Sequence, residues 1–141
     1  RLQSSLRVDS VAEPFIRRRA MRHMEKGRVV ILAGGTGNPF FTTDTAAVKS
    51  ALELDCDVVL KATKVDGVYD KDPALHSGAK KYDSLTHAEA LRSPEVNVMD
   101  NAAVALAMDN QLPIIVFELK VGNLKKVVMG ESIGTKVSHQ K

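Results

Sequence analysis

The chain has 141 residues, 44% of them hydrophobic, which is enough to build one domain or part of one around a core. Its 20 basic and 17 acidic side chains leave a formal charge of +3, too small an excess to indicate a nucleic-acid-binding protein. No apolar run approaches the ~18 residues of a membrane span and no signal peptide opens the chain, so we expect a cytoplasmic protein without a membrane partner. Cys56 is the single cysteine, expected in the core, and the four histidines are scattered, so we expect no disulfide framework and no protein metal site.

The N-terminal part predicts a strand and then a basic helix. Leu2–Val8 has the pattern of a short strand, and Ser10 with Glu13 has the spacing of a capping box. This predicts a helix to about Lys26, ended by Gly27. Its inward positions would be Phe15, Ile16, Ala20 and Met24. The rest of its surface is basic, through Arg17, Arg18, Arg19, Arg22, His23 and Lys26. That surface is either a solvated face or a contact for an anionic effector or a neighbouring subunit.

A glycine-rich stretch, residues 33–44, follows the apolar run Val29–Leu32, which has the β-branched content of a buried strand. A helix is predicted next, over Thr45–Leu54, with an apolar face of Ala47, Ala51 and Leu54. The glycines let the backbone approach a ligand, and the helix N-terminus suits a phosphate. The stretch matches neither the Walker A nor the G-x-G-x-x-G pattern.

Two interpretations of this stretch stay open. It is either a tight turn with Thr42, Thr43 or Asp44 as the N-cap, or a ligand-binding loop. The adjacent Phe40 and Phe41, inside a polar and hydroxyl-rich segment, favour the binding loop, because a plain turn has no use for them.

The next apolar run, Val58–Leu60, places Lys61 at the C-terminal end of a strand, at the rim where ligands of open α/β sheets gather. Asp66-Gly67 and Asp72-Pro73 mark turns. Between them, Tyr69 would either stack on a base or cover the sheet edge.

The C-terminal part alternates short helices and strands. Thr86 and Glu89 have capping-box spacing, and Asp100 is a natural N-cap. The expected elements are helices over Thr86 to about Leu91, 101–109 and Leu124–Met129, a third apolar strand over Ile114–Phe117, and a final edge strand over Gly134–Val137. Three near-continuous apolar strands alternating with helices predict an α/β fold with a mostly parallel sheet.

Two segments taken together resemble the bacterial uridylate kinases (UMP kinases) of the amino acid kinase family. They are residues 34–44, GGTGNPFFTTD, and residues 61–73, KATKVDGVYDKDP. The string TGNPFFTTD is highly specific to UMP kinases, whereas VDGVY is shared more widely in the superfamily. The similarity runs essentially from Arg1 to Val137 and covers the C-terminal portion of a single kinase domain, a little over half of it. It implies a three-layer α/β/α fold.

The resemblance implies transfer of the ATP γ-phosphoryl group to UMP, with Mg²⁺, giving UDP and ADP in pyrimidine nucleotide biosynthesis. It implies an allosteric homohexamer that GTP activates and UTP inhibits.

The resemblance also implies site residues, position by position. Residues implied to bind UMP are Thr36, Gly37, Asn38, Pro39, Phe40, Phe41, Thr42 and Thr43. Residues implied to bind ATP are Thr63, Tyr69 and Asp72. The implied catalytic residues are Asp44, which would organise lysines, Lys61, a transition-state cation, and Asp100. Arg28 lies where the family has an effector-contacting arginine.

The family's N-terminal strand, its lysine-containing glycine-rich loop and its Gly-Gly-Gly-Asn loop are not present in this sequence. Since those loops cradle phosphates, we expect the 141-residue chain alone to be nearly inactive. Two alternatives stay open: another amino acid kinase that acts on a carboxylate or carbamate, which Asn38–Thr43 disfavours, and a non-catalytic nucleotide-binding module, which the missing loops favour.

Overall fold

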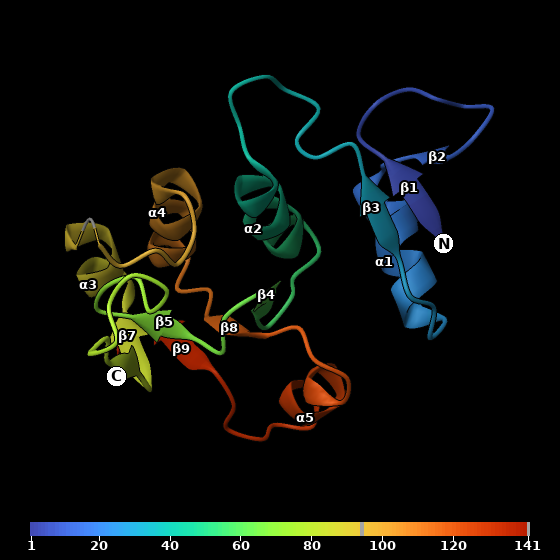
Figure 1. The fold of residues 1–141 in the computed structure, drawn as a ribbon. Coiled ribbons are helices and arrows are strands. Elements are labelled where there is room, and N and C mark those ends of the chain that lie inside the picture. The colour runs from blue at the N-terminus through green and yellow to red at the C-terminus, as the bar shows by residue number, and fades with distance from the viewer. Residues whose placement is uncertain (94, 141) are drawn as a thin grey trace. The chain divides into compact units, whose positions relative to one another are not determined.

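The computed structural model of the chain describes residues 1–93 and 95–140. They form two compact units, Arg1–Cys56 and Asp57–Lys141 (Figure 1). Each unit contains its own small sheet and its own helices. The division falls directly before the second apolar run of the sequence.

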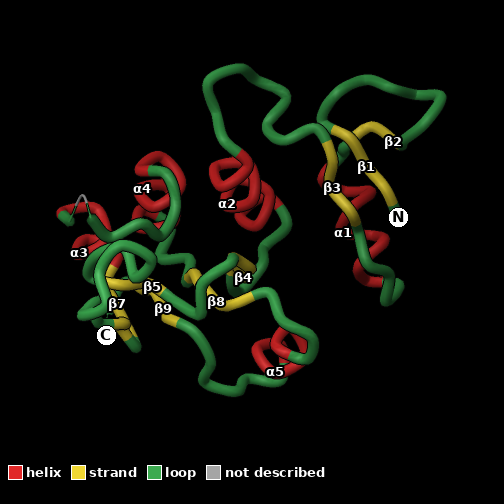
Figure 2. The backbone as a smooth tube through the Cα atoms, viewed as in Figure 1, coloured by secondary structure: helices red, strands yellow, loops and turns green. Residues whose placement is uncertain are grey.

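Unit 1 contains a parallel sheet with the strand order β2-β1-β3. Its strands and helices are β1 (Leu2–Ser4), β2 (Glu13–Pro14), α1 (Arg17–Glu25), β3 (Ile31–Ala33) and α2 (Thr43–Glu53). The predicted first strand is therefore shorter than expected. Figure 2 shows a long loop between β3 and α2, which is the glycine-rich stretch.

The predicted start of the first helix is wrong. Glu13 pairs with β1 as part of a strand, and α1 begins only after Ile16, which has extended backbone and no side-chain cap. The Glu13 carboxylate accepts hydrogen bonds from Gln3 Nε2 at 2.9 Å and from His23 Nε2 at 3.1 Å. These contacts, each ten residues away in sequence, hold Glu13 in the strand. The predicted end is confirmed, because Gly27 follows the cap with a φ of 67°.

Several burial predictions for unit 1 are also wrong. The apolar run before the loop is exposed rather than buried: Val29, which precedes β3, is 80% exposed, and Ile31 of β3 is 60% exposed. The sheet of unit 1 has three short strands, with β3 at its edge. Cys56 is exposed rather than part of the core. Of the predicted apolar face of α2, Ala51 and Leu54 are buried as expected, whereas Ala47 is exposed, and Thr45, Ala46 and Val48 are also buried. Of the predicted inward residues of α1, only Ala20 is fully buried.

Unit 2 is built on a sheet with the order β4-β8-β9-β7 and a separate hairpin, β5-β6. These strands are β4 (Val59–Thr63), β5 (Val68–Tyr69), β6 (Lys81–Tyr82), β7 (Ser84–Thr86), β8 (Ile114–Glu118) and β9 (Thr135–Ser138). The last strand was predicted at an edge but lies inside the sheet, because β7 covers its outer side. The three residues of β7 are too few to show a periodicity.

The helices of unit 2 are α3 (His87–Arg92), α4 (Asn101–Asp109) and α5 (Asn123–Val128). In Figure 1, α3 and α4 lie above the sheet of this unit and α5 lies below it. Both predicted caps are confirmed: Thr86 and Glu89 form a complete capping box, and Asp100 caps α4.

Strand pairing confirms the predicted fold class. β1 is parallel to both of its neighbours, and β4–β8 and β7–β9 are parallel, whereas β8–β9 and β5–β6 are antiparallel. The chain is therefore an α/β protein with mostly parallel strands. Within the described residues, every helix is too short or too polar to cross a bilayer.

Candidate functional site

The predicted UMP loop lies in unit 1, between β3 and α2. The Thr42 hydroxyl accepts hydrogen bonds from the backbone N–H groups of Asp44, at 3.1 Å, and Thr45, at 3.4 Å. Thr42 is therefore the N-cap among the three candidates. Thr43 and Asp44 lie in the first turn of α2, at the positive end of the helix dipole. This end of the helix suits an anion.

Thr36 and Asn38 bond to each other at the start of this loop. The backbone N–H of Asn38 donates to Thr36 Oγ1 at 3.1 Å, and Asn38 Nδ2 donates to the carbonyl of Thr36 at 3.3 Å. Gly34, with a φ of 83°, lies so close to the segment after β1 that a Cβ would stand 2.7 Å from Ser5 Oγ. The loop therefore has a defined turn at its beginning that only glycine permits.

The two phenylalanines of the loop point into solvent. Phe40 is 102% exposed and Phe41 is 55% exposed. Phe40 also has a φ of 68°, a strained conformation for an aromatic residue. Exposed large apolar side chains and local strain are typical of a binding segment. The predicted residues Gly37 and Pro39 lie in the same loop.

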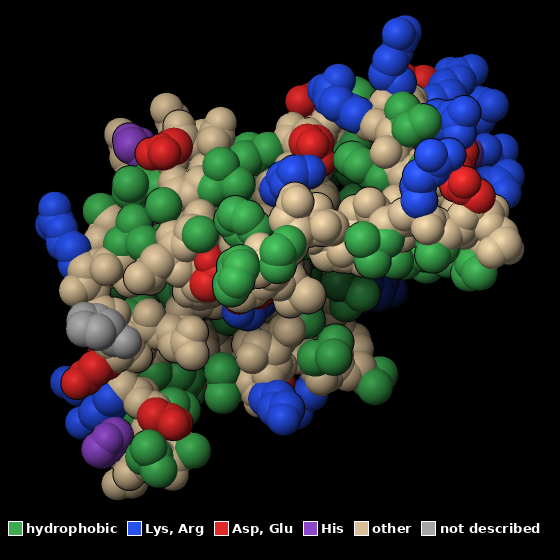
Figure 3. All heavy atoms as spheres, turned by 90° about the horizontal axis from the view of Figure 1, so that it is seen from above, with side chains coloured by type: hydrophobic (Ala, Val, Ile, Leu, Met, Phe, Trp, Pro, Cys, Tyr) green, Lys and Arg blue, Asp and Glu red, His purple; other side chains and the backbone are tan. Residues whose placement is uncertain are grey.

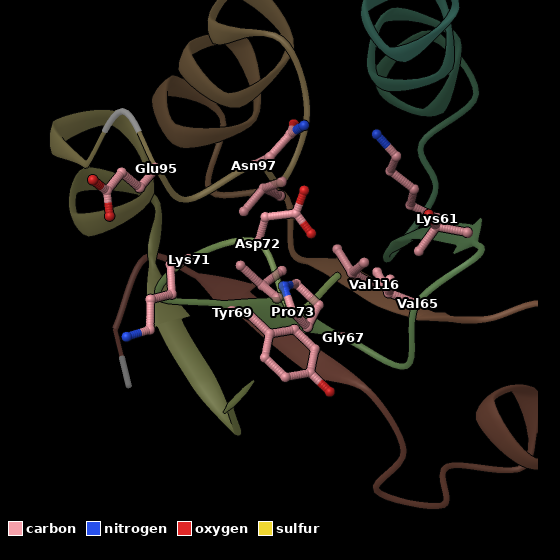
Figure 4. A pocket seen from close by; sticks show the side chains of 13 residues that line it. Lys61, Val65, Gly67, Tyr69, Lys71, Asp72, Pro73, Glu95, Asn97 and Val116 are labelled. Atoms are coloured by element: carbon pink, nitrogen blue, oxygen red, sulfur yellow. The ribbon is translucent and has the colours of Figure 1, made fainter. Parts of the chain in front are cut away.

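The predicted ATP segment lies in unit 2, around a cavity of about 430 Å³ (Figure 4). This volume is in the range of small-molecule sites. The cavity is lined by Lys61, Thr63, Val65, Gly67, Val68, Tyr69, Lys71, Asp72, Pro73, Glu95, Asn97, Val98 and Val116. Lys61 is the middle residue of β4 and not, as predicted, its C-terminal end, because the pairing with β8 continues to Thr63. Lys61 lies opposite Val116 of β8 in the parallel register. The structure thus brings Lys61, Thr63, Tyr69 and Asp72 to one cavity.

Hydrogen bonds beside this cavity hold two of its lining residues, Tyr69 and Asp72. The Tyr69 hydroxyl donates to Asp66 Oδ1 at 2.6 Å, and Lys81 Nζ donates to Asp66 Oδ2 at 3.2 Å. The bond from Tyr69 lowers the pKa of the Asp66 carboxyl below its ordinary value, and the same bond raises the pKa of the Tyr69 phenol. Asp72 Oδ1 accepts from the backbone N–H of Ala74 at 2.8 Å, which fixes the Asp-Pro turn.

Not all predicted site residues belong to this cavity. Asp100 is outside its lining and caps α4. Asp44 and residues 36–43 belong to unit 1, and the cavity belongs entirely to unit 2. Conversely, Glu95 and Asn97 line the cavity although sequence reasoning missed them. No sequence signal marks them, because only tertiary packing brings them to the cavity.

The cavity carries oxygen donors of the kind that Mg²⁺ accepts. They are the carboxylates of Asp72 and Glu95 and the amide oxygen of Asn97. Among residues 1–93 and 95–140, however, no three His, Cys, Asp or Glu side chains are grouped so that they could hold a metal ion. These residues fit a Mg²⁺ ion that is held mainly by nucleotide phosphates.

Known proteins resemble this chain along most of its length. The model of the amino acid kinase family matches residues 4–118. The crystal structure of UMP kinase from Bacillus anthracis is 39% identical, with a TM-score of 0.95 over 100% of this chain and 58% of that chain. UMP kinase from Ureaplasma parvum is 32% identical, with a TM-score of 0.88 over 97% of this chain and 59% of that chain. Uridylate kinase from Archaeoglobus fulgidus is 32% identical, with a TM-score of 0.71 over 89% of this chain and 59% of that chain.

This chain thus spans less than two thirds of the length of these relatives. The fold of the described residues is that of the solved UMP kinases. The chain belongs to the amino acid kinase family.

Proposed function

We propose that this chain is the C-terminal portion of a nucleoside monophosphate kinase that transfers the ATP γ-phosphoryl group to UMP and releases UDP and ADP. The observation that carries the proposal is the cavity of unit 2, which is lined by Lys61 and Thr63 of the parallel strand β4 and by Tyr69 and Asp72. Thr63 is the C-terminal residue of that strand. This is where open α/β sheets bind ligands. The 39% identity to a UMP kinase over the whole chain supports the choice of UMP as the acceptor.

In this proposal the unit 2 cavity binds ATP. Tyr69 packs against the adenosine, while Thr63 and Asp72 supply hydroxyl and carboxylate contacts to its polar groups. Lys61 provides a compact positive charge for the transferring phosphoryl group. Mg²⁺ would enter with ATP, near Asp72 and Glu95, and it would neutralise phosphate charge.

The unit 1 loop binds UMP in the same proposal. The phosphate lies near Thr36 and Asn38, and the part from Phe41 to Thr43 faces the uracil and ribose. Asp44 fixes lysine ammonium groups by charge-assisted hydrogen bonds. Asp100 acts as a second carboxylate near the donor. Phosphoryl transfer needs such positioning and electrostatic stabilisation more than covalent help from the protein.

We extend the proposal to the family's regulation: a cytoplasmic homohexamer in pyrimidine nucleotide biosynthesis, activated by GTP and inhibited by UTP. Lys and Arg side chains gather over unit 1 (Figure 3). Arg17 is paired with Asp55, and Arg19 with Glu13, so part of this charge is neutralised locally. Arg28 Nη1 lies 3.1 Å from His23 Nδ1 and is our candidate effector contact.

A coupled assay that compares UMP with glutamate, aspartate and carbamate as acceptors tests the reaction. ADP formation that depends on UMP alone is the expected result, at a low rate, because the family's N-terminal phosphate-binding loops are not part of this sequence. Formation of ADP with a carboxylate or carbamate instead would contradict the proposal.

The second candidate is a nucleotide-binding module without catalytic activity, in which the cavity of unit 2 holds a nucleotide. Calorimetry with UMP and ATP separates the two. Binding of both nucleotides without any turnover supports the module, whereas turnover at any measurable rate that requires Lys61 supports the kinase.

A further inference from the structure

We propose that Asp66 is a positioning residue of the ATP cavity, which acts by fixing the ring of Tyr69 and is itself held by Lys81. This inference rests on the proposed function of the cavity. It adds a residue that touches no nucleotide but sets how tightly the adenosine triphosphate is bound.

The first argument is that both oxygens of Asp66 are used. Oδ1 accepts the Tyr69 hydroxyl at 2.6 Å, and Oδ2 accepts Lys81 Nζ at 3.2 Å. The bond from Tyr69 is short and charge-assisted, the stronger class of hydrogen bond. Because a tyrosine ring has only two side-chain torsions, one such bond at its tip is enough to select its orientation.

The second argument is that Asp66 and Lys81 do not face the ATP cavity. They line a neighbouring polar cavity of about 290 Å³, whereas Tyr69 lines the ATP cavity. Figure 4 shows the Tyr69 hydroxyl directed away from Asp72 and Asn97. The Asp66 side chain therefore does not line the ATP cavity itself, and its hydrogen bond links it to that cavity through Tyr69.

The third argument is that the backbone under Tyr69 is already fixed. Gly67 is packed so closely that a Cβ would lie 2.6 Å from Thr135 Oγ1 and 3.0 Å from Lys81 Cδ. Thr135 Oγ1 also accepts the backbone N–H of Val68 at 2.8 Å. The β5-β6 hairpin is thus hydrogen-bonded to β9 next to Tyr69. What the bond to Asp66 adds is a fixed orientation of the Tyr69 ring.

The Tyr69 phenol gives a direct readout, because the sequence contains two tyrosines and no tryptophan. In a Tyr82→Phe background, the phenolate absorbance reports Tyr69 alone. Asp66→Asn is expected to lower the pKa of Tyr69 from its raised value toward the ordinary 10.0. The matched control is Asp83→Asn, which removes the same charge from an exposed carboxylate of the same region and should leave the titration unchanged.

ATP binding is then measured by calorimetry. We expect Asp66→Asn to weaken ATP binding about five- to tenfold, the equivalent of one ordinary net hydrogen bond, while Asp83→Asn has no effect. In a Tyr69→Phe background, Asp66→Asn should cause no further loss. Circular dichroism confirms that each variant is folded.

An unmoved Tyr69 titration, an unchanged ATP affinity, or an equal loss in the Tyr69→Phe background would each overturn the proposal. If the parent chain binds no ATP, the proposed function itself fails. The Tyr69 titration still reports in that case whether the hydrogen bond exists.

Discussion

Asp100 Oδ1 accepts a hydrogen bond of 2.9 Å from the backbone N–H of Ala103, so the carboxylate proposed as catalytic is also the N-cap of α4. A capping side chain needs only an oxygen acceptor, whereas a catalytic carboxylate needs its charge. The two roles of Asp100 can therefore be separated by substitution.

Asp100→Asn is expected to keep the unfolding free energy within a few tenths of a kcal/mol, because asparagine caps helices as well as aspartate. Asp100→Ala should cost about 1 kcal/mol. If Asp100 is catalytic, both variants lose UMP-dependent ADP formation. Urea unfolding and the coupled assay measure these two effects. If the Asp100→Asn variant stays active, helix capping is a role of Asp100 and catalysis is not.

Thr135 joins the hairpin to the main sheet of unit 2. Its fully buried hydroxyl accepts from Val68 N–H and donates to the carbonyl of Tyr82. Thr135→Val leaves both backbone groups without this partner, so we expect a loss of about 2–3 kcal/mol in unfolding free energy. Thr135→Ser keeps the hydroxyl and should lose only about 1 kcal/mol for the missing methyl. Urea unfolding followed by circular dichroism measures the difference, and equal losses would contradict the anchoring role.

The unfolding free energy should decrease at acidic pH because of His87, whose side chain is buried, with 1% exposure. Its Nε2 lies 3.0 Å from the carbonyl oxygen of Leu112, and its Nδ1 has no hydrogen-bond partner within the described part of the chain. Burial lowers the pKa of His87 below 6.5, and the charge of nearby His139 acts in the same direction. Below pH 6.5 the unfolded chain therefore binds a proton that the folded chain excludes, and stability is lost as the pH falls.

The measurement is the unfolding free energy at about pH 7.5 and about pH 5. His87→Gln keeps a donor for Leu112 but does not titrate. We expect the parent to lose up to about 1.4 kcal/mol per pH unit more than this variant. A parallel pH dependence in both proteins would show that His87 is not the source.

Phe40 offers a test of the UMP loop that leaves the core untouched. Its side chain is fully exposed and its φ is positive, a conformation that asparagine adopts more easily. Phe40→Asn should therefore leave the unfolding free energy unchanged within about 0.5 kcal/mol. We expect this substitution to weaken UMP binding, measured by calorimetry, and to leave ATP binding unaffected. Unchanged UMP affinity would remove Phe40 from the proposed site.

Features that depend on nearby residues could be predicted from the sequence. The caps at Thr86 and Asp100 and the helix end at Gly27 involve partners within a few positions. The grouping of Lys61, Thr63, Tyr69 and Asp72 around one cavity could be predicted as well, since these residues follow one another along a strand and a hairpin. Their binding of a nucleotide stays a prediction. Their meeting around one cavity needs no long-range information.

Features that depend on distant residues could not be predicted. Glu13 is a strand residue because Gln3 and His23 hold its carboxylate, although its local spacing is that of a helix cap. Asn97 reaches the cavity through tertiary packing alone. On α2 the prediction was right for Ala51 and Leu54 and wrong for Ala47, since alanines on neighbouring faces show little difference in hydrophobicity.

The exposure of Phe40 makes the loop between β3 and α2 a natural cleavage site for chymotrypsin, which cuts after aromatic residues on accessible chain. The rate of cleavage by chymotrypsin therefore measures how accessible this loop is. If a nucleotide slows digestion, that nucleotide covers the loop. The fraction of the chain that stays uncut would then report the fraction that has bound the nucleotide.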